Sequence, residues 1–123
     1  MEKILNLTQH KATNEQLQAG VVEPSDLTKK VIVSKYLTFT EIPSRDELRK
    51  RAYGLAELVV KMKYKQVMIG GANYFMSHLE LALKEKGIQP LYSFTQRVTE
   101  EQVTENGEII KTSVFKHLGF VEV

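Results

Sequence analysis

The stretch "VMIGGANYFMSHLELALKEKG", residues 67–87, contains the alternation on which the fold depends. It begins with a short apolar run typical of a buried strand, passes Gly70-Gly71, and continues with apolar residues at the spacing of one helix face. These apolar positions are Phe75, Leu79, Ala82 and Leu83. We expect Asn73 to cap this helix and Gly87 to end it. A strand that leads directly into an amphipathic helix is typical of α/β proteins. The question is what role Gly70 and Gly71 have at this junction.

Strand and helix signals also alternate upstream of this stretch. "KILNL", residues 3–7, predicts a first strand. Thr13 and Gln16 have the spacing of a capping box, which predicts a short helix that ends near Gly20. "VVEP", residues 21–24, predicts a second short strand that the proline closes.

Residues 25–37 carry conflicting signals. Ser25 can cap a helix, whereas the run "VIVSKYLTF" is β-branched and resembles a strand, so we expect a helix only in the first part. The next helix start is clear, because Ser44 and Glu47 form a second capping box. We expect this helix over residues 45–62.

Beyond residue 64 the sequence contains two more strand signals and then a hairpin signal. "KQVMIG", residues 65–70, and "LYSF", residues 91–94, predict two more strands of the alternating part. Asn106-Gly107 then lies between two strand-like halves, which is a strong hairpin signal. We therefore predict an α/β fold: a single small three-layer domain over residues 1–123, with a mostly parallel sheet and a C-terminal β-hairpin extension.

Composition excludes several classes of protein. The 123 residues are 42% hydrophobic and 26% charged, with zero cysteines and a net charge of +2. This balance suits one globular domain, and the absence of cysteine excludes disulfides and thiolate metal sites. No apolar run approaches the roughly 18 residues of a membrane span, and "MEKILNL" is too short for a signal peptide, so we expect a cytoplasmic protein with no membrane partner. The small net charge argues against duplex nucleic acid, and the basic stretch at residues 45–65 is interleaved with acidic residues, as on a solvated helix face.

Several reaction chemistries lack their sequence patterns. No pair of histidines has metal spacing, and the G-x-S-x-G, P-loop and G-x-G-x-x-G patterns are absent. We therefore expect neither a metal nor a cofactor. Glu100 and Glu101 are expected on the solvated face of a hairpin strand, and the position of His78 and His117 within regular elements favours structural roles.

Ligands of open α/β sheets bind beyond the carboxyl ends of the parallel strands, and that rule selects three segments here. They are Thr8-Gln9-His10, Gly70-Gly71-Ala72-Asn73 and Ser93-Phe94-Thr95-Gln96-Arg97. We expect them to converge on one rim. Glycines let a ligand approach the backbone, and the following helix N-terminus offers free N–H groups, which suits an anion or the edge of a nucleobase. The alternative is a tight turn that serves close packing only.

Four side chains of this rim are candidates for chemistry. Arg97, expected just past a strand end, can hold a phosphate with two hydrogen bonds, with Thr95 beside it. Thr8 and His10 add a hydroxyl and an imidazole. The alternatives are an exposed arginine that opens the hairpin and a histidine that is only hydrogen-bonded.

Three segments resemble a known family in the same order along the chain. "HKATNEQ" is similar to a His-x-Leu-Thr-x-x-Gln opening, "GIQPLYSFTQR" to a strand ending in Thr-Thr-x-Arg, and "GEIIKTSVFKHLGFVEV" to a closing Phe-x-His-x-x-Phe strand. The chain thus resembles the small stand-alone CRISPR-associated proteins of the CARF type, which are Rossmann-like domains that bind cyclic oligoadenylates in antiviral defence. The positions carried over are His10, Thr13, Gln16, Thr95, Arg97, Phe115, His117 and Phe120. Two positions depart from the pattern: Gly70-Gly71-Ala72 replaces Gln-Gly-acidic, and Phe94 replaces the first threonine.

The resemblance implies an activity and a partner. Some members are ring nucleases, in which a ribose 2′-OH attacks the adjacent phosphate without a metal. Here Arg97 would stabilise the phosphate charge, Thr95 would bind a phosphate oxygen, the N–H groups of residues 71–73 would position the ring and His10 would be a candidate acid or base. A cyclic ligand with two-fold symmetry suits a homodimer.

Two other functions stay open from the sequence. The first is a nucleotide sensor with the same pocket and dimer but no turnover, which the departures at the glycine turn favour. The second is a protein-interaction accessory domain of a defence or mobile element. Such a domain would expose an apolar patch, for which Tyr36, Phe39 and Tyr53 are candidates, although core or interface positions are the alternative for these aromatic residues.

Overall fold

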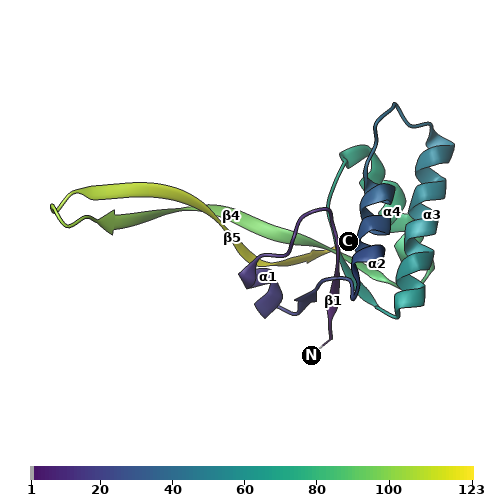
Figure 1. The fold of residues 1–123 in the computed structure, drawn as a ribbon, viewed down its shortest axis with the longest axis horizontal. Helices are drawn as coiled ribbons and strands as arrows, with labels where there is room; N and C mark the ends of the chain where they lie inside the picture. The colour runs from purple at the N-terminus through teal and green to yellow at the C-terminus, as the bar shows by residue number, and fades with distance from the viewer. Residues whose placement is uncertain (1) are drawn as a thin grey trace.

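A computed structural model describes residues 2–123, which form a five-stranded sheet flanked by helices (Figure 1). In chain order the elements are β1 (Ile4–Leu7), α1 (Asn14–Gln18), β2 (Val21–Val22), α2 (Leu27–Leu37), α3 (Arg45–Met62), β3 (Gln66–Ile69), α4 (Asn73–Glu85), β4 (Gln89–Val103) and β5 (Ile109–Glu122). The strand order is β2-β1-β3-β4-β5. All neighbours are parallel except β4 and β5, which form an antiparallel hairpin. The predicted fold class is confirmed.

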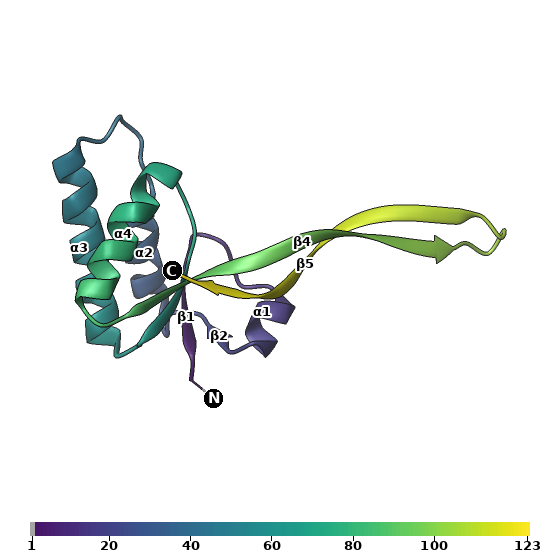
Figure 2. The ribbon, with the colours of Figure 1, turned by 180° about the vertical axis from the view of Figure 1, so that it is seen from behind.

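The two faces of the sheet are covered very differently. Alternate residues of β1 and β3, such as Leu5 and Val67, pack with helices α2, α3 and α4 in the main core. The intervening residues, such as Ile4 and Met68, belong to a smaller cluster on the side of α1. The three larger helices thus lie on one side of the sheet and the short α1 on the other (Figures 1 and 2).

Helix α2 corrects the prediction for the β-branched run. The whole of "VIVSKYL" is helical, and Asp26, not Ser25, caps the helix by accepting a hydrogen bond from the Lys29 N–H at 2.8 Å. Val33 and Leu37, one turn apart, are buried on its inner side. This tertiary burial outweighs the modest helix cost of β-branched residues.

Of the other predicted helix caps, those of α1 and α3 are found and that of α4 is not. The capping box of Thr13 and Gln16 has both of its hydrogen bonds. Ser44 caps α3 as predicted, but only this half of the second box is present, because the Glu47 carboxylate pairs with Arg51. At α4, however, Ala72 occupies the cap position without a side-chain hydrogen bond, and Asn73 is the first residue of the helix. The prediction that Asn73 caps α4 is wrong.

The largest difference from the sequence prediction concerns β4. Its pairing with β3 stops at Leu91, but the strand continues to Val103 and pairs with β5 throughout. The predicted turn is found at Thr104–Gly107, where Gly107 has φ +81°. A register shift between Phe94 and Thr95 marks where the hairpin leaves the body. We call residues 95–117 the arm; it projects away from α2, α3 and α4 (Figures 1 and 2).

The helices of residues 2–123 include none with the length and apolar character of a membrane span.

Candidate functional site

A cleft of about 370 Å³ lies at the carboxyl ends of β1 and β3, beside β4. Its lining comprises Thr8, Gln9, His10, Lys11, Thr13, Gln16, Met68, Ile69, Gly70, Gly71, Tyr92 and Ser93. The three segments selected from the sequence therefore do converge, through Thr8-Gln9-His10, Gly70-Gly71 and Ser93. Ala72, Asn73, Thr95, Gln96 and Arg97 are not part of the lining.

The polar lining of the cleft is free of carboxylates. It consists of hydroxyls, two side-chain amides, the imidazole of His10 and the ammonium group of Lys11. Lysine and imidazole groups favour an anion, and hydroxyls and amides can bind either phosphate oxygens or the edge of a base. The lining therefore suits a phosphorylated ligand better than a cation.

The loop that carries Thr8 and His10 is held in place by Asn6, a fully buried residue of β1. The Asn6 side-chain NH₂ donates to the His10 carbonyl and to Glu23 Oε1, both at 2.7 Å. Its Oδ1 accepts hydrogen bonds from the Thr8 N–H at 3.0 Å and from the Thr8 hydroxyl at 2.7 Å. Asn6 thus fixes one wall of the cleft, and the signal for it was a polar residue inside the apolar run of residues 3–7.

Glu23 supports the same loop from outside the cleft. Its carboxylate accepts hydrogen bonds from the Ala12 N–H at 2.9 Å and from Lys30 Nζ at 2.8 Å. Burial on its own raises the pKa of Glu23, but the hydrogen bonds from Lys30, Asn6 and Ala12 outweigh it and lower the pKa below 4.5. Glu23 is therefore ionised at neutral pH, and its charge is directed at Lys30 and not at the cleft.

Gly70 and Gly71 form another part of the cleft lining, next to Thr8. Gly71 has φ +154°, which residues with a side chain rarely adopt. A Cβ at Gly70 would only meet the Thr8 methyl group at 3.5 Å, an ordinary contact. The turn therefore requires a glycine at position 71, whereas a small side chain would fit at position 70.

Ser93 links the cleft to the hairpin. Its hydroxyl is 2.6 Å from His117 Nδ1 and 3.3 Å from the Thr95 hydroxyl, and it accepts a hydrogen bond from Gln16 Nε2 at 3.2 Å. The imidazole of His117 packs edge-on against Phe120 with the ring centroids 4.7 Å apart. Four of the positions carried over from the CARF resemblance, namely Gln16, Thr95, His117 and Phe120, are thus contiguous through Ser93.

Arg97 lies elsewhere. It is an exposed residue of the arm, within β4, and its guanidinium lies over the ring of its cross-strand neighbour Phe115 at 5.0 Å. The expectation that Arg97 follows the end of a strand is wrong, because hairpin pairing with β5 extends β4 beyond Leu91. Glu100 and Glu101 are on the arm as predicted, paired with Lys116 at 3.0 Å and with Lys111 at 3.8 Å.

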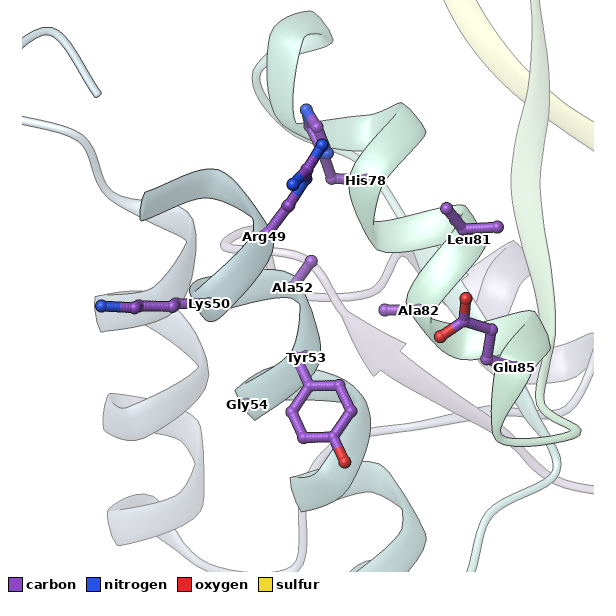
Figure 3. Close-up of a pocket in the computed structure, with 9 residues that line it drawn as sticks. All are labelled: Arg49, Lys50, Ala52, Tyr53, Gly54, His78, Leu81, Ala82 and Glu85. Atoms are coloured by element: carbon purple, nitrogen blue, oxygen red, sulfur yellow. The ribbon is translucent and has the colours of Figure 1, made fainter. Parts of the chain in front are cut away.

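A second hollow, of about 630 Å³, lies between α3 and α4 (Figure 3). Tyr53, Leu81 and Ala82 provide much of its apolar surface, and His78 and Arg49 lie at one end. Of the aromatic residues considered for an exposed patch, Tyr36 and Phe39 pack against the main core, and only Tyr53 is exposed, at 47%. The three aromatic residues therefore do not form one apolar patch.

Comparison with known proteins gives one family. The model described as "Uncharacterized protein MJ1673 family" matches residues 2–121, nearly the whole chain. No curated protein and no solved structure matches the chain.

Proposed function

The chain belongs to the MJ1673 family, and we propose that it is a homodimeric receptor that binds a cyclic oligoadenylate at the carboxyl ends of its parallel strands. One observation carries this proposal: the cleft at those strand ends is lined by hydroxyls, amides, a lysine and a histidine, without a carboxylate. Such a lining neutralises phosphate and can bind base edges.

The size of the cleft supports a ligand shared by two copies. A volume of about 370 Å³ is near the lower end for small-molecule sites and suits one nucleotide. A ring of several nucleotides exceeds it. Two clefts related by a two-fold axis would each hold part of such a ring, because a symmetric ligand matches a symmetric pair of sites.

The resemblance to CARF-type proteins adds the identity of the ligand. His10, Thr13 and Gln16, three of the carried-over positions, line the cleft. Three more, Thr95, His117 and Phe120, reach it through Ser93. This contiguity supports a common role for residues that are about 100 positions apart in the chain.

Cleavage of the ring is the further step of the proposal. In a metal-independent ring nuclease the 2′-OH gives up its proton and attacks phosphorus, the P–O bond to the neighbouring 5′-oxygen breaks, and that oxygen takes up a proton. His10 lines the cleft and is a candidate acid or base, and Thr95 is a candidate phosphate ligand. The absence of Arg97 from the lining of its own cleft favours the alternative, a sensor that binds the ring intact.

Binding and cleavage can be tested together with cyclic tetra-adenylate and cyclic hexa-adenylate in the presence of a chelator. Separation of bound ligand followed by chromatography distinguishes intact rings from linear products. We expect binding by the unmodified protein, and about a tenfold loss of affinity in Lys11→Gln, because a hydrogen bond to a charged group contributes about 1.5 kcal/mol or more.

Lys35→Gln is the matched control. It makes the same change in net charge at an exposed residue of α2 that does not line the cleft, and should leave affinity unchanged. Failure of the unmodified protein to bind either ring would refute the proposal. Equal losses of affinity in both variants would mean that the anion responds to the net charge of the protein and does not bind in the cleft.

A further inference from the structure

The arm is a two-stranded ribbon with little support from the rest of the chain. Beyond Leu91, β4 has lost its parallel neighbour β3 and pairs only with β5. Both views show the arm projecting away from the body (Figures 1 and 2). A lone hairpin is at best marginally stable in water, and its free edges invite pairing with another chain.

The arm also exposes large apolar side chains. Val103, Ile109 and Phe115 are 73%, 63% and 66% exposed. In the antiparallel register Val103 is opposite Ile109, and Phe115 is opposite Arg97, so all of them lie on one face of the ribbon, with the Glu101–Lys111 ion pair between the two pairs. His117, which contacts Ser93 in the cleft, shares this face through its pairing with Thr95. The apolar face of the arm is thus a continuation of the candidate site.

Charge favours a second copy of this chain as the occupant. The arm, residues 95–117, contains three basic and four acidic residues, whereas the rest of the chain contains fourteen and eleven. Glu105 and Glu108 at the tip take part in no ion pair within residues 2–123, while Glu100 and Glu101 are paired along the arm. An acidic arm of one copy therefore complements the basic body of another.

The area is sufficient for an interface. Nine residue pairs of the arm at about 3.4 Å per residue give a length of about 30 Å, and a ribbon about 10 Å wide has about 300 Å² on one face. Two arms that each bury one face against the partner remove about 1,200 Å² in total, which is the lower limit of stable interfaces.

We infer that two copies of the chain exchange arms, with the apolar face of each arm lying along the cleft rim of the other copy. This inference depends on the proposed function at one point only, which is the choice of the cleft rim as the surface that the partner's arm covers. It assigns a role to the exposed Arg97 and Phe115, which would reach the partner's rim. The arms and not a helix face then hold the dimer together.

The oligomeric state can be measured without any ligand. We expect sedimentation equilibrium of the unmodified chain to give twice the 14.1 kDa monomer mass. The double variant Ile109→Lys/Phe115→Lys should weaken the dimer about tenfold or more, because central apolar contacts dominate interfaces. Leu81→Lys, a single change of the same kind at a 60% exposed residue of α4, should leave it unchanged. Circular dichroism would verify that each variant is folded.

Cross-linking identifies the surface that the arm covers. The chain has no cysteine, so Thr99→Cys gives one attachment point for a photoreactive maleimide on the same face of the arm as Arg97 and Val103. In a mixture of ¹⁴N- and ¹⁵N-labelled protein, mixed-label peptides joining the arm to residues 8–16 or 68–73 are expected. A monomeric protein, a dimer that resists the double variant, or mixed-label cross-links only to other surfaces would each overturn the inference.

Discussion

At the scale of single residues, Asn6 shows how one buried polar group can shape a cleft. Four hydrogen bonds tie it to Thr8, to His10 and to Glu23, which is 17 residues away. An alanine would remove all four of these hydrogen bonds at a position that water does not reach. The wall of the cleft and the stability of the chain thus depend on the same side chain.

We therefore expect Asn6→Ala to lower the free energy of unfolding by about 2–3 kcal/mol. Urea denaturation measures this change as a shift of the midpoint with an unchanged slope. Asn73→Ala, at the exposed first residue of α4, is the control and should change stability by less than about 0.5 kcal/mol. A similar small effect at Asn6 would show that the network does not stabilise the fold.

At the scale of elements, α2 and α3 approach closely where Gly54 meets Tyr36. A Cβ at Gly54 would lie 2.8 Å from the Tyr36 hydroxyl oxygen and 2.9 Å from a ring carbon. Glycine in a helix costs about 1 kcal/mol relative to alanine, so its presence in the middle of α3 is explained by the room that the tyrosine needs.

This explanation predicts an energetic coupling between the two positions. In a Tyr36→Ala background, Gly54→Ala should stabilise the chain by about 1 kcal/mol, the helix-propensity gain. In the presence of Tyr36 the same change should give less stabilisation or a loss, because the ring must move. A double-mutant cycle of denaturation free energies measures the difference. Equal effects in both backgrounds would show that the contact does not explain the glycine.

The elements also show what the sequence can and cannot predict. Helices α3 and α4 follow from apolar periodicity, and α3 from its cap as well, because these signals are local. The β-branched α2 was ambiguous, since burial of Val33 and Leu37 against other elements decides it. The continuation of β4 was missed, although no glycine, proline or asparagine interrupts residues 91–103.

For the candidate site, too, some features can be predicted from the sequence and others cannot. The convergence of Thr8, Gly70 and Ser93 could be predicted because parallel strands end at a common edge. The supporting contacts of Glu23 could not, because they join residues whose separation in the chain says nothing about their separation in space. Arg97 was placed wrongly for the same reason as β4: the site prediction depended on where one strand ends.

At the scale of the whole molecule, the position of Arg97 matters for how a site would be completed. Arg97 is on the arm and does not line the cleft of its own chain. If arms are exchanged, a complete site consists of the cleft of one copy, with Lys11, and Arg97 of the other. A guanidinium that arrives from the partner would add a bidentate phosphate contact to a cleft whose own cation is a lysine.

Mixed dimers test this arrangement with adenosine 5′-monophosphate, a probe small enough to occupy one cleft at a time. A dimer of one Arg97→Ala subunit and one Lys11→Gln subunit should retain one site of full affinity, made of Lys11 from the first and Arg97 from the second. Its other site should be about tenfold weaker or worse. A dimer that carries both changes in one subunit should instead have a single defect in each site and no site of full affinity. Calorimetric titration counts the strong sites. The reverse pattern would place Arg97 in the site of its own chain, and one strong site in both mixed dimers would show that Arg97 belongs to neither site.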